Sequence, residues 1–297
     1  MPSIPRMPGS APAAPNARVP PADGLVSLPA WMRGARATLG LVPRRLPGAT
    51  RCGVLWEAES GRFLLTVPEV ARYLATEGRS LTIDPDPDAD PADVSRFALT
   101  TPLAALCLER GLPVLHAAAL IGPSGAAVIC GDSAAGKSTL AAALALRGWT
   151  LIADDLAPIA LDDDFAPIVQ PTGSRIALWP DAVEALGVDI THATDPEGFP
   201  ARWAPEFVAL APTPVTAVWW LRLDSVPALE SRDLKGAERL EAISAMAYNS
   251  HIAAALLDPA AHLRIAGALA RTTVMRRVRR PRSRWSVEEL ADLIEAG

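Results

Sequence analysis

The chain has 297 residues, half of them apolar and only 5% aromatic, and it carries a formal net charge of −5. This length can bury one large core, or one core and a smaller lobe, built mainly from Ala, Leu and Val. The acidic balance argues against nucleic acids and membrane surfaces as partners. No apolar stretch is long and unbroken enough to predict a membrane span.

The N-terminal segment and the cysteines bear on the cellular compartment. Residues 1–24 are rich in Pro and Ala but lack the apolar core of a signal peptide, so they predict a disordered tail. Cys52, Cys107 and Cys130 show neither a paired framework nor CxxC spacing, and each lies among apolar or small residues. We therefore expect buried, unreactive thiols in a reducing cytoplasm.

Residues 25–111 predict a small β-rich lobe that ends in a helix. Short strands are expected on both sides of the turns Ser60-Gly61 and Glu77-Gly78. They cover residues 52–59, 62–67, 70–76 and 80–83. An acidic, proline-punctuated stretch that begins at Asp84 is interpreted as a solvated linker, and a single helix is expected over 92–110.

Residues 112–297 predict an α/β domain. Its expected strands cover residues 126–130, 150–153, 156–161, 166–169, 215–223 and 272–278, and its expected helices cover 138–147, 180–186, 236–249 and 259–270. A further strand precedes the turn at 122–125. Ser286 and Glu289 have the spacing of a capping box that opens a last helix. The stretch 189–214 has few apolar repeats and is expected to be irregular.

One motif in this domain has a chemistry that can be derived residue by residue. It is a complete GxxxxGK[ST] loop, Gly131-Asp132-Ser133-Ala134-Ala135-Gly136-Lys137-Ser138-Thr139. The glycines allow backbone N–H groups to face a phosphate, Lys137 can reach its outer oxygens, and Ser138 offers a hydroxyl to Mg²⁺. A strand before the loop and a helix after it complete the pattern, because the helix N-terminus favours an anion. These nine residues therefore predict a nucleotide site.

Two adjacent carboxylates, Asp154 and Asp155, follow the next expected strand. A helix and a strand return the chain to the sheet edge at which ligands bind, so both should face the ligand of the loop. One can hold Mg²⁺ together with Ser138, and the other can accept a proton from an attacking hydroxyl. Asp224 is an alternative metal ligand, but Arg222 interrupts its strand, and we interpret Asp224 as a surface residue.

The order of these motifs resembles the catalytic domain of HPr kinase/phosphorylase. The resemblance is carried by Leu115-His116-Ala117-Ala118, by the loop 131–139 and by the stretch 147–155, which ends in the paired aspartates. It implies an α/β fold with a P-loop core related to phosphoenolpyruvate carboxykinase, a mixed sheet with flanking helices, and phosphorylation of a protein serine with ATP and Mg²⁺. Residues 171–180 and 268–281 look more like HPr-kinase-related proteins of peptide-tailoring operons. Those include lasso-peptide kinases, which phosphorylate the C-terminal serine of a precursor.

The resemblance also implies roles for single residues. Lys137 and Ser138 match the nucleotide and Mg²⁺ residues, Asp154 the general base, Asp155 a metal ligand, and His116 a histidine near the phosphates. On the residues alone, a single histidine on an apolar strand is more often a core residue. The family also implies an oligomer.

Two residues of the loop differ from the pattern of the bifunctional HPr kinase/phosphorylases. Ala134 stands where those enzymes usually carry Gly, and Thr139 stands where they carry Glu. No counterpart of their glycine-rich signature follows the paired aspartates. These differences argue against phosphorylase activity and against HPr as the substrate. We expect a cytoplasmic kinase that phosphorylates a serine of a peptide or small protein. A P-loop ATPase and a nucleotide-sensing module without phosphotransfer stay open as alternatives.

Three further features have two interpretations each. Arg175 could bind a phosphate or a peptide carboxylate, or lie on the surface beside a strand. Trp179 is interpreted as a packing residue. Residues 271–284 hold seven arginines, which predict either an alternating edge strand with a solvated face or a docking surface for an acidic peptide or for ATP phosphates.

Overall fold

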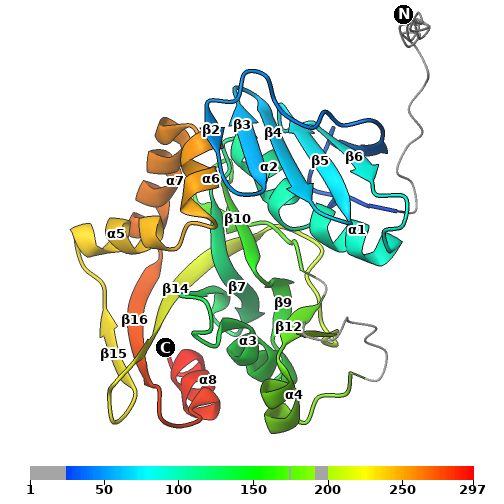
Figure 1. Cartoon of the computed structure of the whole chain (residues 1–297). Helices are drawn as coiled ribbons and strands as arrows, with labels where there is room; N and C mark the ends of the chain where they lie inside the picture. The colour runs from blue at the N-terminus through cyan, green and yellow to red at the C-terminus, as the bar shows by residue number, and fades with distance from the viewer. Residues whose placement is uncertain (1–24, 174, 191–199) are drawn as a thin grey trace, which may run out of the picture.

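The computed structural model describes residues 25–173, 175–190 and 200–297. It is a mixed α/β structure in which several sheets have flanking helices (Figure 1). The predicted tail over 1–24 and the middle of the expected irregular stretch lie outside the described residues.

The N-terminal part forms a sheet with the strand order β1-β6-β5-β4-β3-β2. Burial alternates along β5, where Ala71, Tyr73 and Ala75 face the core, as expected of a sheet with one covered face. The expected strand over 52–59 is interrupted at residues 53–55, where the chain bends at Val54 and Leu55. The strands are β1 (Arg36–Leu39), β2 (Arg51–Cys52), β3 (Trp56–Glu59), β4 (Arg62–Val67), β5 (Ala71–Thr76) and β6 (Ser80–Pro85).

Two helices, α1 (Pro91–Ala98) and α2 (Thr101–Glu109), stand where one helix was expected. Pro102 is the reason, because proline lacks an N–H group and is tolerated in the first turn of a helix but not in its interior. α2 is buried along most of its length. Its core with the N-terminal sheet continues past residue 111 into Val114, Leu156 and Ile252.

The larger sheet has the order β11-β10-β7-β8-β14-β16-β15, and β9 also pairs with β7. β8, β14 and β16 are parallel to one another, whereas β7 and β15 run antiparallel to their neighbours. In the strand order, β16 lies between β14 and β15, so the interpretation of this stretch as an edge strand is wrong. The bounds are β7 (Val114–Gly122), β8 (Gly125–Gly131), β9 (Thr150–Ala153), β10 (Leu156–Leu161), β11 (Pro167–Val169), β14 (Thr213–Asp224), β15 (Glu230–Asp233) and β16 (Val274–Pro281).

Helices cover both faces of this sheet. α3 (Lys137–Leu146), α4 (Pro180–Leu186) and α8 (Val287–Glu295) share a core with Ile129 and Trp219. α5 (Ala237–Ala245) and α7 (Pro259–Thr272) pack on Val128 and Val218, the neighbouring residues that point to the opposite face. α6 (Ser250–Leu256) packs on the N-terminal core, and β12 (Ile176–Leu178) pairs with β13 (Ala201–Trp203). The helix that was expected over 236–249 is α5, and it ends at Ala245, earlier than predicted.

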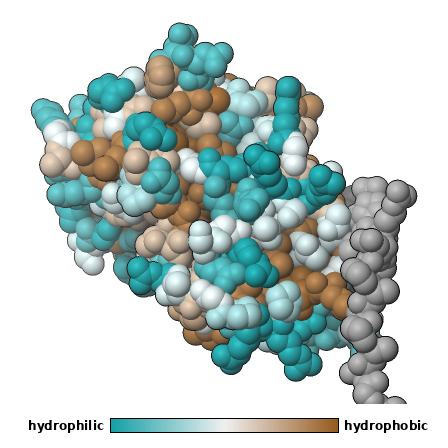
Figure 2. Space-filling view, turned by 90° about the horizontal axis from the view of Figure 1, so that it is seen from above, coloured by the Kyte–Doolittle hydropathy of each residue, from teal (hydrophilic) through white to brown (hydrophobic). Residues whose placement is uncertain are grey.

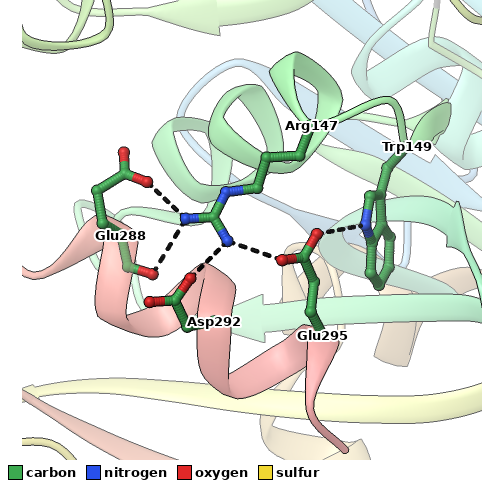
Figure 3. A network of polar contacts seen from close by, with 5 residues as sticks. All are labelled: Arg147, Trp149, Glu288, Asp292 and Glu295. Carbon is green, nitrogen blue, oxygen red and sulfur yellow. Dashed lines mark hydrogen bonds and ion pairs between the residues drawn. The ribbon is translucent and has the colours of Figure 1, made fainter.

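The start of α8 differs from the expected capping box. Ser286 is the N-cap residue, but its side chain makes no capping hydrogen bond, and Glu289 pairs with Arg284 instead. α8 is held at its other side by Arg147 at the end of α3, whose guanidinium contacts Glu288, Asp292 and Glu295 (Figure 3). Trp149 Nε1 also donates a hydrogen bond to the Glu295 carboxylate. This network fixes α8 against α3.

Three observations concern membrane spans, the surface and the cysteines. Within the described residues, no helix is both long and apolar enough to cross a membrane. The face seen from above carries apolar patches between hydrophilic side chains (Figure 2). Cys52 is exposed, contrary to the expectation, whereas Cys107 and Cys130 are buried, and all three are free thiols.

Candidate active site

Strand β7 brings together the three sequence motifs, which are His116, the loop 131–139 and the pair Asp154-Asp155. It does so because it lies between β8, which precedes the loop, and β9, which precedes the pair. Both neighbours run antiparallel to β7, so their carboxyl ends reach the same edge of the sheet. Cys130 of β8 pairs with Ala117, and Ala153 of β9 pairs with Ala119. His116 lies one residue before Ala117 on β7. The shared edge is thus formed across an antiparallel strand, not between two adjacent parallel strands.

The loop between β8 and α3 needs its glycines. A Cβ atom on Gly131 would lie 2.6 Å from the Leu221 carbonyl oxygen, and one on Gly136 would lie 2.3 Å from Arg280 Nη1. Gly136 has a φ of 90° and is the N-cap of α3, so no side chain occupies that helix end. Ala134 has a φ of 62°. It keeps a left-handed backbone conformation that glycine adopts without strain.

The Lys137 side chain folds back over its own loop. Its Nζ donates hydrogen bonds to the carbonyl oxygens of Gly131, at 3.0 Å, and Asp132, at 3.1 Å. Burial lowers the pKa of Lys137, and the nearby charge of Asp155 opposes that shift. The ammonium group is therefore held at the loop, with acidic groups close to it.

Asp154 and Ser138 form the first polar pair of the site. Ser138 Oγ, in the first turn of α3, donates to Asp154 Oδ1 at 2.9 Å. The backbone N–H of Ala177 in β12 donates to Oδ2 at 3.0 Å. Burial raises the pKa of Asp154 to about 6, although both hydrogen bonds act in the opposite direction. Both oxygens of this carboxylate thus have partners in the protein.

Asp155 and His116 form the second pair. Asp155 is exposed, and its Oδ1 lies 3.1 Å from His116 Nε2. The His116 ring meets the Tyr248 ring edge-on, and its backbone N–H donates to the Met246 carbonyl. Asp155 has a φ of 73°, a conformation that turns the chain directly after β9. The two adjacent aspartates therefore face different partners.

Most of these groups border one cleft of about 650 Å³, but Asp154, Gly131, Asp132 and Ala135 are not among its lining residues. Of the predicted site residues, those lining it are His116, Ser133, Ala134, Gly136, Lys137, Ser138, Thr139 and Asp155. Arg175 is exposed and is not among the lining residues. Trp179 lines the cleft and is 57% exposed, so its interpretation as a packing residue is wrong.

The end of β16 and the following loop supply one wall of the cleft. A surface for ATP phosphates was one interpretation of the arginine-rich stretch, but it did not single out Arg280 or include Trp285. Arg280, Arg282, Arg284 and Trp285 all lie on this wall. Arg280 Nη1 donates to the Ala135 carbonyl at 3.2 Å, and burial lowers the pKa of this guanidinium. The arginine-rich composition of the stretch is the signal in the sequence for this wall, and it does not distinguish one arginine from another.

The same strand also carries arginines that serve the structure. Arg276 pairs with Asp233, and Arg279 pairs with both Asp224 and Glu230. The pKa of Asp224 is lowered, mainly by its hydrogen bond from Arg279. Asp224 is thus engaged by an arginine and does not line the cleft. In the described part of the chain, no group of three or more His, Cys, Asp or Glu residues could hold a metal ion.

Comparison with known proteins gives a distant structural likeness. No family model and no curated protein matches the chain. Among solved structures, the chain is similar to the HPr(Ser) kinase/phosphatase from Coxiella burnetii, with 15% sequence identity and a TM-score of 0.32, over 62% of this chain and 86% of that one.

Proposed function

We propose that the protein is a kinase that transfers the γ-phosphoryl group of ATP to a serine hydroxyl of a peptide or small protein. The observation that carries this proposal is the position of Asp155. It is an exposed carboxylate, paired with His116, on the same cleft as Lys137 and the glycine-containing loop. Binding of nucleotide phosphates needs only the loop, whereas a hydroxyl acceptor also needs a proton acceptor beside the phosphates.

The loop residues fit the phosphates of a nucleotide. Gly136 leaves the first N–H groups of α3 without a side-chain cap, and such groups bind anions. Lys137 is already held at the loop by carbonyl oxygens that phosphate oxygens can replace. Arg280 adds a second cation against the backbone of the loop.

Ser138 and Asp154 fit a Mg²⁺ ion, which takes oxygen ligands and usually binds one or two protein groups together with substrate phosphates. Their oxygens are already 2.9 Å apart. The ion would supply positive charge to the phosphate oxygens. We therefore assign Asp154 as a Mg²⁺ ligand and Asp155 as the group that accepts the proton. This is the reverse of the roles that the family resemblance implies.

In the proposed reaction, the serine oxygen forms a bond to the γ-phosphorus, and the bond to the bridging oxygen of ADP breaks. Asp155 takes the proton of the hydroxyl, and His116 Nε2 orients that carboxylate through their contact. Lys137 and Arg280 stabilise the negative charge on the transferring group. A positioned base of this kind contributes roughly 10²- to 10⁴-fold to the rate.

The test is transfer of label from γ-labelled ATP, with Mg²⁺, to peptides that end in serine, with Lys137→Ala as the inactive control. If the peptide is labelled with the wild-type protein but not with Lys137→Ala, the result supports a kinase. Release of phosphate without labelled peptide points to an ATPase. Binding of ATP without turnover for any acceptor points to a nucleotide-sensing module.

A further inference from the structure

The cleft has two walls, one on each side of the N-terminus of α3. α3 packs against α8 on one side and against β12 and α4 on the other (Figure 1). Each wall presents one tryptophan: Trp179 precedes α4 and is 57% exposed, and Trp285 precedes α8 and is 44% exposed. Neither ring is packed into a core, although both border a cleft with many charged residues.

The Trp179 wall adjoins the reacting end of the site. Ala177, two residues before Trp179, donates its N–H to Asp154. The next residue along the chain from Asp154 is the proposed proton acceptor. We therefore expect the acceptor hydroxyl on this side of the cleft.

The Trp285 wall lies on the other side of α3, and it is cationic. Arg280 contacts the loop carbonyl of Ala135, and Arg282 and Arg284 follow along the same wall. A nucleotide whose γ-phosphate faces Asp155 must direct its other end away from the paired aspartates. That end carries the sugar and the base.

We infer that Trp285 stacks on the base of the nucleotide, an inference that depends on the proposed function. Aromatic side chains bind bases of any kind through their π-faces. The segment that carries Trp285 is also held in place. Arg284 Nη2 donates to Glu289 Oε2 at 2.9 Å, and Arg147 fixes α8 through three carboxylates (Figure 3). A pre-positioned ring loses less conformational freedom when it binds.

The test compares two ligands that differ in the base. ATP and inorganic tripolyphosphate, each with Mg²⁺, are titrated into the full chain by calorimetry. We expect Trp285→Ala to weaken ATP binding about tenfold to hundredfold and to leave tripolyphosphate binding unchanged. Trp285→Phe should retain most of the ATP affinity. Phe207→Ala is the matched control, because Phe207 is 46% exposed and does not line the cleft.

Each other outcome has a separate meaning. If the wild-type protein binds both ligands and Trp285→Ala binds ATP normally, the inference is wrong and the proposed function stands. It is also wrong if Trp285→Ala weakens both ligands equally, or if Trp179→Ala causes the loss of ATP binding in its place. If the wild-type protein binds neither ligand, the proposed function fails, and the inference fails with it.

Discussion

His116 Nε2 lies 3.1 Å from Asp155 Oδ1, and this contact joins two segments that the sheet brings to a common edge. β7 carries His116 between the ends of β8 and β9. The adjacent Asp154 faces Ser138 instead. Two neighbouring carboxylates thus have different surroundings, one half-buried and hydrogen-bonded and one exposed beside an imidazole, and such differences commonly separate acid–base from binding roles.

Exchanging each aspartate for asparagine tests this division. We expect Asp155→Asn to lower the rate of phosphoryl transfer roughly 10²- to 10⁴-fold and to leave the affinity for ATP with Mg²⁺ nearly unchanged. Asp154→Asn should weaken the Mg²⁺-dependent part of that affinity. Single-turnover rates and ATP titrations with and without Mg²⁺ measure both effects. If Asp154→Asn removes transfer and spares Mg²⁺-dependent binding, the roles implied by the family resemblance are the right ones.

The elements that could be predicted from the sequence are those with strong local signals. β9, β10 and α4 have the predicted bounds, because apolar runs, a proline at a helix start and a glycine at a helix end mark them. The helix predicted over 92–110 failed at Pro102. The capping box failed because Arg284 engages Glu289, a contact set by the approach of the chain and not by spacing.

The position of the loop 131–139 and of the paired aspartates directly after strands could also be predicted from the sequence, and the structure has both there. The different surroundings of Asp154 and Asp155 could not be predicted, because they depend on Ala177 and His116, which are distant in the sequence. For a similar reason, the sequence could offer the arginine-rich stretch as a surface for phosphates but could not say which of its arginines reach the loop. Along β16, the neighbours Arg280, which meets the loop, and Arg279, which pairs with carboxylates, point to opposite faces of the sheet.

Two neighbouring arginines of β16 give a matched pair of variants. Arg280 contacts the loop at Ala135, whereas Arg279 pairs with Asp224 and Glu230 away from the cleft. Arg280→Ala should lower kcat/KM for ATP about tenfold to hundredfold, since hydrogen bonds to charged groups contribute roughly 1.5–3 kcal/mol. Arg279→Ala should leave kcat/KM close to the wild-type value. Equal losses in the two variants would contradict a role for Arg280 at the phosphates.

The stability of the protein should depend on pH through Glu109, far from the proposed chemistry. Burial raises the pKa of this carboxyl to about 7, and its Oε2 accepts a hydrogen bond from the Gly78 N–H. A pKa above the value of the unfolded chain means that the protonated form stabilises the fold. This contribution is complete below pH 4.5, the ordinary pKa, and is lost as the pH rises through 7.

Glu109→Gln should remove this pH dependence, because glutamine stays neutral. At pH 8 the variant should therefore be more stable than the wild-type protein by about 1–3 kcal/mol, and near pH 4.5 the difference should become small. Urea unfolding of both proteins across this range measures the difference in the free energy of unfolding. If that difference is the same at both ends of the range, ionisation of Glu109 is not the cause.

Arg147 connects α3 to the C-terminal helix, and its removal should loosen that helix selectively. Its guanidinium contacts Glu288, Asp292 and Glu295 (Figure 3). Single exposed ion pairs contribute less than about 1 kcal/mol, but a shared network contributes more. We expect Arg147→Ala to increase amide hydrogen exchange in α8 and to leave exchange in the N-terminal sheet unchanged, as followed by mass spectrometry.

Arg147→Lys should restore only part of the protection, because an ammonium lacks the planar fork that reaches three carboxylates. Unchanged exchange in α8 would mean that its apolar face, with Leu290 and Ile294 buried against the core, is sufficient to hold it.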